Sequence, residues 1–288
     1  MKDYHFLVAG LAQINMEDSK LPYSVQQFKE DVLPFVTEKD RRLLELPYLQ
    51  YDNLNILDIL AGNGNIAGDR CPLYDRTDIE DFVQSVEKGA EVQDYDYPVY
   101  MFSFLTEYFE YVSQNQHATP AELGVYARNG LNRFYYDYAC SVNNRFVREW
   151  YWFNRNVKNL LSACTVRRYA LKADDAIMGD DAVARALRTS GSRDWGLSME
   201  LDYFDEVMRI DQEQDLTKKE KLIDTLKWNW LEENSFFNYF TVEALFVFIS
   251  KLVIVDRWIR LDAELGNRML RSIIADFKAD VNVPQNFE

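Results

Sequence analysis

The hydrophobic pattern is most regular between Thr119 and Lys172, where apolar residues recur in steps of three or four. This spacing places them along one face of an α-helix. Thr119, Pro120 and Glu122 mark the start, as N-cap, first-turn proline and capping-box carboxylate. The pattern predicts one long amphipathic helix, or two helices laid end to end, with two early glycines as candidate breaks. The apolar stripe consists of Leu131, Phe134, Tyr138, Val142, Phe146, Trp150, Phe153, Val157, Leu160 and Cys164.

Further helices follow from capping patterns and apolar spacing in the rest of the chain. Ser24 with Gln27 predicts a helix to about Val32, and Thr37 predicts a second one through Leu46. The short apolar run Tyr4–Leu11 fits either a strand or a buried extended arm. Later helices are expected at residues 78–88, from about 98 to 116, at 197–210, from Thr217 through Trp230, at 241–260 as a central core helix, and through Phe277.

Composition agrees with a helical protein large enough to bury a substantial core. The 288 residues are 48% hydrophobic and 15% aromatic, with only 11 glycines and 7 prolines, which disfavours a turn-rich β architecture. We therefore predict an all-α fold, a multi-lobed helical bundle with a long central amphipathic helix. The chain is expected to form a single domain with provisional lobes at residues 1–118, 119–212 and 213–288.

Charge is segregated along the chain. The net charge is −15, yet Arg128–Lys172 contains nine basic and only two acidic residues. These cations either neutralise acidic neighbours such as Glu200, Asp202 and Asp205, or form a basic docking strip for an acidic partner. An isoelectric point near 4.7 argues against general nucleic-acid binding.

The sequence offers little for catalysis or for binding a cofactor or metal. The three cysteines are far apart and lack metal-ligand spacing, which is typical of reduced thiols in a cytosolic protein. The two histidines, His5 and His117, are far apart in the sequence, and no nucleophile or zinc motif occurs. The glycines of Ala61–Asp69 have the wrong spacing for a nucleotide-binding fingerprint. No catalytic, cofactor or metal residue is predicted, and no membrane span or signal segment is expected.

The most enzyme-like cluster is a set of four aspartates at positions 174, 175, 180 and 181. Aspartate pairs on a helix hold magnesium against a diphosphate in isoprenoid-type enzymes, which are also all-α. Here the pairs frame Gly179, and the spacing favours a solvated loop.

Three segments near the N-terminus carry a family resemblance: YHFLVAGL (Tyr4–Leu11), LPYSVQQFKEDV (Leu21–Val32) and YDNLNILDIL (Tyr51–Leu60). They resemble an uncharacterised family of Bacteroides-like bacteria that is encoded with the subunits of V-type (archaeal-type) ATPases. Members occupy the place of the C subunit, which is called d in eukaryotes, and are similar to it in size and helical content.

The resemblance implies a non-catalytic subunit that couples the central stalk to the membrane rotor ring during proton or other ion transport. The C subunit is a three-lobed helical funnel that receives the end of the stalk on the cytoplasmic side of the membrane. Expected partners are therefore the stalk subunits and the rotor ring, with peripheral localisation at the inner face of the cell membrane. From charge pattern alone, the candidate partner-binding residues are Arg145, Arg148, Arg155 and Lys158. A stand-alone helical adaptor and a magnesium-dependent isoprenoid-type enzyme are the alternatives.

Overall fold

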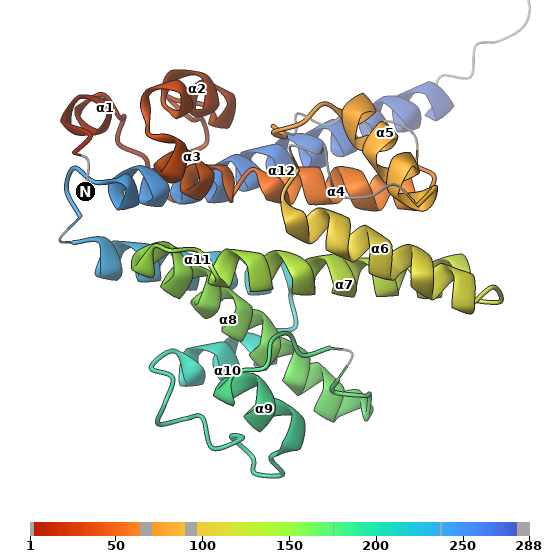
Figure 1. Cartoon of the computed structure of the whole chain (residues 1–288). Coiled ribbons are helices and arrows are strands. Elements are labelled where there is room, and N and C mark those ends of the chain that lie inside the picture. The colour runs from red at the N-terminus through yellow and green to blue at the C-terminus, as the bar shows by residue number, and fades with distance from the viewer. Residues whose placement is uncertain (1–2, 64–70, 90–96, 175, 237, 281–288) are drawn as a thin grey trace, which may run out of the picture.

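The computed structural model describes residues 3–63, 71–89, 97–174, 176–236 and 238–280, with side chains as far as residue 262. In these residues the chain forms twelve α-helices, one 3-10 turn and no strand, which confirms the predicted all-α fold (Figure 1). No helix among them is both long and apolar enough to span a membrane. The elements are α1 (His5–Ala9), α2 (Val25–Asp31), η1 (Leu33–Phe35), α3 (Glu38–Glu45), α4 (Leu49–Leu60), α5 (Arg76–Glu87), α6 (Val99–Gln114), α7 (Pro120–Cys140), α8 (Arg145–Tyr169), α9 (Ala182–Thr189), α10 (Phe204–Gln212), α11 (Leu216–Ser235) and α12 (Val242–Asp280).

The helices lie in layers, and α8 connects them. Figure 1 shows α4 and α12 in one layer, α7 and α11 in the next, and α8 running from there toward α9 and α10. Helix α8 packs against α7, α9, α10, α11 and α12. Its middle is buried on almost every side, including Phe153, Val157 and Leu160 of the predicted stripe. A helix surrounded in this way has little solvent face to accept polar residues, so its buried asparagines and arginine need partners inside the protein.

The long predicted stretch forms two helices, which are not laid end to end. Helix α7 ends at Cys140, and Asn144 takes an extended backbone and caps α8, its Oδ1 accepting a hydrogen bond from the Val147 amide at 3.0 Å. The reversal at residues 141–144 folds α8 back onto α7, with the Tyr135 and Tyr151 rings 5.7 Å apart. Neither early glycine breaks α7. The predicted capping box at Thr119 is present.

Capping predictions succeeded where one candidate stood alone and were wrong where two stood close together. Ser24 and Thr37 cap α2 and α3 as expected. Helix α5 begins after Asp75 rather than at Asp78, and α11 is capped by Asp215 rather than by Thr217. The expected helix at 197–210 begins only at Phe204.

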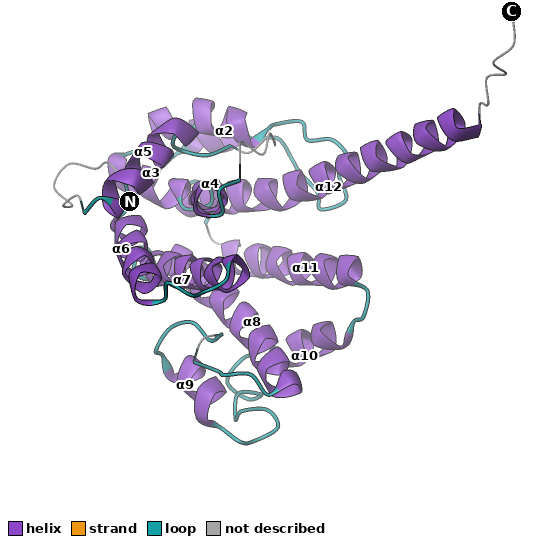
Figure 2. Cartoon of the chain, turned by 90° about the vertical axis from the view of Figure 1, so that its right-hand side faces the viewer, coloured by secondary structure: helices purple, strands orange, loops and turns teal. Residues whose placement is uncertain are grey.

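The two ends of the chain also differ from expectation. The segment Tyr4–Leu11, predicted as a strand or extended arm, contains the short helix α1, and the Tyr4 amide donates to the Phe240 carbonyl at 2.6 Å. The two expected C-terminal helices are one, α12, which is 39 residues long and projects beyond the other helices (Figure 2).

The buried apolar side chains form one continuous cluster. Helix α6 packs on α7, and α12 packs on α2 and α3, so these contacts cross the provisional lobe boundaries near residues 118 and 213. The three-lobe division stays a prediction.

Candidate partner-binding cleft

Several cations of the basic stretch pair with acidic residues inside the protein. Arg133 pairs with Glu107 of α6, and Arg168 pairs with Asp211 of α10. The expected acidic partners Glu200, Asp202 and Asp205 are not the ones used, and among the described residues they form no ion pair. These cations are therefore neutralised by Glu107 and Asp211, which the charge pattern of the sequence did not identify as partners.

The four predicted partner-binding residues do not share one surface. Arg145 is exposed and pairs with Glu149 at 2.7 Å, and the exposed Arg148 reaches the Val142 carbonyl at 3.4 Å. Arg155 is buried, so a partner cannot reach it in this conformation. Lys158 is exposed and lines a cleft along α8.

Arg155 and its neighbours attach the loop before α9 to α8. This loop carries Asp174, Asp180 and Asp181 and is called the aspartate loop below. The Arg155 guanidinium lies 3.2 Å from Asp137 of α7 and also pairs with Asp181, whose Oδ1 caps α9 by accepting from the Ala184 amide at 2.9 Å. A Cβ added at Gly179 would lie 2.8 Å from the guanidinium carbon, and Gly179 has φ +81°. Only glycine therefore lets the loop approach this closely.

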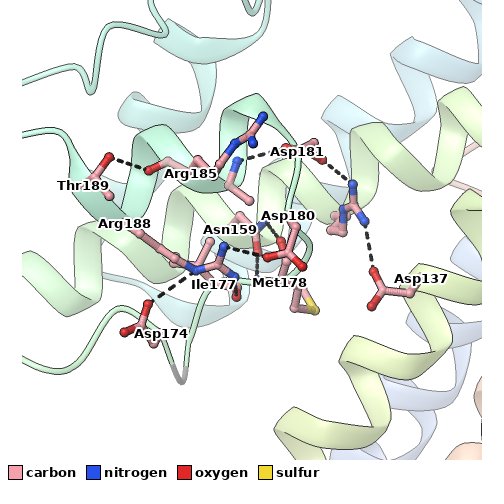
Figure 3. Close-up of polar contacts among 12 residues, drawn as sticks. Asp137, Asn159, Asp174, Ile177, Met178, Asp180, Asp181, Arg185, Arg188 and Thr189 are labelled. Atoms are coloured by element: carbon pink, nitrogen blue, oxygen red, sulfur yellow. Dashed lines mark hydrogen bonds and ion pairs between the residues drawn. The ribbon is translucent and has the colours of Figure 1, made fainter.

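Asn159 completes this attachment by bonding to both backbone groups of Met178. Its Nδ2 donates to the Met178 carbonyl at 2.8 Å, and its Oδ1 accepts from the Met178 amide at 2.9 Å (Figure 3). On the outer side of the loop, Arg188 lies 3.7 Å from Asp174 and 3.4 Å from Asp180. Both aspartates contact Arg188, and of the two only Asp174 lines the cleft described below. Asp175 lies outside the described residues.

A cleft with a volume of about 1080 Å³ lies along α8. Residues of α4, α6, α7, α8, α11 and α12 and the loop around Ile177 line it. Tyr136, Trp150 and Tyr151 contribute aromatic surface, and the aliphatic lining includes Val157, Leu161, Ile223, Val253 and Ile254. The cleft is therefore wide, open and partly apolar, as expected of a surface that receives another molecule.

One wall of the cleft is held by a buried carboxylate. Asp224 of α11 is 2% exposed and pairs with Arg257 of α12 and, at 3.3 Å, with Lys227. The Trp258 Nε1 donates to the same carboxylate at 2.9 Å, and Arg257 also lies 3.0 Å from Glu220. This network ties α11 to α12 where both line the cleft.

Among the described cations of the cleft, Lys158 differs from the others because it has no acidic partner. Its side chain lies in the cleft and meets solvent there, with Nζ 5.2 Å from the centre of the Tyr136 ring. Burial among the cleft walls lowers the pKa of the ammonium, while the charge of Glu220 acts in the opposite direction. Among the described residues, no carboxylate forms an ion pair with it.

The remaining candidates from the sequence do not assemble into a site. Cys71, Cys140 and Cys164 are free thiols, and burial raises the pKa of each to about 11. His5 packs against Phe240, with ring centres 4.1 Å apart and the two rings tilted by 38°. Across the part of the chain that is described, no three His, Cys, Asp or Glu side chains cluster as metal ligands would. Most of Ala61–Asp69, from residue 64 onward, lies outside the described residues.

Sequence reasoning missed the cleft and the network at Asp224, because both depend on helices that are far apart in the chain. It also missed Asp52, a buried carboxylate of α4 that accepts hydrogen bonds from the Leu73 and Tyr74 amides. The one available signal was an aspartate within the apolar segment Tyr51–Leu60.

Comparison with known proteins places the chain in a family. Residues 1–281 match the model of DUF2764, described as a protein of unknown function, and the chain belongs to this family. Neither a curated protein nor a solved structure matches the chain.

Proposed function

We propose that this protein is a non-catalytic subunit of a V-type (archaeal-type) rotary ATPase, in the place of the C subunit. It would connect the central stalk to the membrane rotor ring at the cytoplasmic face and transmit torque between them. The resemblance of Tyr4–Leu11, Leu21–Val32 and Tyr51–Leu60 supports this particular assignment. The all-helical architecture agrees with it.

The observation that carries the mechanical role is the open cleft along α8. With side chains, an α-helix is about 10–12 Å wide, so a cleft of about 1080 Å³ holds roughly two turns of a helix. A stalk ends in such a helical tip under this proposal. The apolar lining would bury one face of it, and the charged rim at Glu220 and Arg257 would meet its polar side.

Many of the described polar groups around the cleft are engaged in holding the fold. Asp224 ties α11 to α12, and Arg155 with Asn159 ties the aspartate loop to α8. A rigid receptor of this kind suits a part that must pass on force, because its walls are cross-linked to their neighbours by ion pairs and hydrogen bonds.

The test is purification of the native complex from membranes through an affinity tag on this chain. Central-stalk and rotor-ring subunits should co-purify in mild detergent. In membranes of cells that lack the chain, ATP hydrolysis by the head should persist while ATP-driven ion transport is lost.

The control is an equally tagged soluble protein of similar size and charge. Recovery of this chain alone, or with partners unrelated to an ATPase, would contradict the proposal and favour a stand-alone adaptor.

A further inference from the structure

We propose that Lys158 binds a carboxylate on the partner helix that occupies the cleft. The inference rests on the proposed function, since it takes the occupant to be a helical segment of the central stalk. It adds the chemistry of recognition: an amphipathic helix whose apolar face is interrupted by one acidic side chain.

The cations that line the cleft differ in whether they have an acidic partner. Four cations line it, and three have carboxylate partners: Arg133 with Glu107, Lys227 with Asp224, and Arg257 with Glu220 and Asp224. In the described part of the chain, Lys158 alone among these four has no ion pair.

The acidic residues of the lining are likewise engaged. Glu107, Glu220 and Asp224 are in the ion pairs just given, and Asp174 pairs with Arg188 at 3.7 Å. Glu122, at one end of the cleft, accepts from the Thr119 amide and hydroxyl at 2.8 Å as part of a capping box. Each cleft carboxylate among the described residues is therefore already held by a partner other than Lys158.

Filling the cleft would remove water from the Lys158 ammonium. A helix that filled the cleft would displace the water through which Lys158 now reaches solvent, and an unpaired ammonium among apolar groups is costly. A carboxylate on the occupant would offset that cost through a charge-assisted hydrogen bond. The Tyr136 ring, 5.2 Å away, already supports the cation from one side.

The experiment measures binding of the recombinant full-length chain to the purified central-stalk subcomplex of the same ATPase. Lys158→Met removes the charge and is expected to weaken binding roughly 10- to 100-fold, the range for one charge-assisted hydrogen bond. Lys158→Glu should weaken it further, because it places two carboxylates together. Lys158→Arg should keep most of the affinity.

The matched control is Lys218→Glu, which makes the same charge change at an exposed lysine of α11 outside the cleft. It should leave binding within about twofold. Thermal unfolding of every variant shows whether the fold is intact, and Lys158→Arg preserves the test if the other two variants are unstable.

The outcomes separate the two proposals. If the native chain binds the stalk and Lys158→Glu binds equally well, the role of Lys158 is overturned while the assignment to the ATPase stands. If the native chain does not bind the stalk, both fall. A reciprocal acid-to-base change on the stalk that restores binding to Lys158→Glu would identify the carboxylate.

Discussion

Asp52 shows how a single buried acid holds together parts of the chain that lie apart in sequence. Its carboxylate accepts from the Leu73 amide at 3.1 Å and from the Tyr74 amide at 3.2 Å, which fixes the segment before α5 onto α4. Burial raises the pKa of Asp52 to about 7, although both backbone hydrogen bonds and the charge of Lys29 oppose the shift. The folded protein therefore holds this proton more tightly than the unfolded chain does.

The raised pKa of Asp52 makes the stability of the protein depend on pH. The unfolded chain releases the proton near the ordinary pKa of 3.8 and the folded chain near 7. This carboxyl therefore makes the free energy of unfolding fall as pH rises from about 4 to about 7, with little further change above. Asp52→Asn has no ionisable group at this position and so lacks this loss of stability with rising pH. Between pH 5 and pH 8 the free energy of unfolding of the variant, relative to that of the native chain, should therefore rise by about 2 kcal/mol. Urea unfolding at the two pH values measures it.

Asp78→Asn serves as the control, because Asp78 is an exposed carboxylate of α5. Its stability difference from the native chain should be nearly the same at both pH values. An Asp52→Asn difference that is equally flat would show that Asp52 ionises normally in the folded protein.

The role of a single residue could be predicted from the sequence when its partners lie close to it in the chain. The capping boxes at Ser24 and Thr119 could be predicted because their partners lie three residues away. The position of Lys158 in a cleft could not, because helices from both halves of the chain build its surroundings. Arg155 illustrates the same limit: charge pattern marked it as a surface residue, and tertiary packing buries it.

At the scale of elements, Asn144 both starts α8 and links it to α12. Its Oδ1 caps α8, while its Nδ2 donates to Glu243 Oε1 at 2.7 Å, at the first turn of α12. Glu243 is only 5% exposed, so it depends on this donor. The same residue explains why the long stretch breaks here: an asparagine side chain competes well with the helical backbone for its amides.

Asn144→Asp keeps the cap acceptor but loses the donor and places two carboxylates together. It should lower the free energy of unfolding by about 2 kcal/mol near neutral pH. Adding Glu243→Gln supplies a new donor and should restore at least half of the loss. Chemical denaturation of the two single variants and the double variant measures this coupling.

Glu243→Gln alone is the control, since Asn144 can still donate to the amide oxygen. It should cost less than Asn144→Asp. Strict additivity in the double variant would mean that the two side chains do not interact.

The continuity of α12 was missed for a related reason. The sequence predicted one helix at 241–260 and another through Phe277, yet the charged residues near this boundary are used within a single helix. Arg260 pairs with Asp256 at 2.5 Å four residues earlier, and Arg257 pairs with Asp224. Charge density alone does not distinguish a solvated connection from an ion-paired helix surface.

At the scale of the whole molecule, the core ends before α12 does. Val255, Trp258 and Ile259 are its last described contributors, while the final turns of the helix project away from the other helices (Figure 2). Removal of residues 263–288 should therefore shift the midpoint of thermal unfolding by no more than about 2 °C.

Removal of residues 256–288 is the matched comparison, because it also takes away Arg257, Trp258 and Ile259 and leaves Asp224 buried without two of its partners. That variant should unfold at a much lower temperature or fail to fold. Differential scanning calorimetry distinguishes the two deletions, and equal losses would mean that the projecting turns contribute to the core.

At this scale the proposed function rests on family resemblance and not on any pattern that the chain itself carries. Periodicity predicted the helical class because each amphipathic helix carries its own pattern. The cleft arises from the crossing of α8 with its neighbours, and no segment of the chain encodes that crossing by itself.

Helix α12 forms a wall of the cleft and also extends outside the protein body as the same uninterrupted rod. At about 1.5 Å per residue, its 39 residues span roughly 58 Å. Ser250, Val253, Ile254 and Arg257 face the cleft from it, and no loop separates them from its outer end. A continuous helix has no flexible joint between its two ends. A bend or twist applied at the outer end of α12 would therefore be transmitted to the cleft wall, and a force on the cleft wall would be transmitted to the outer end.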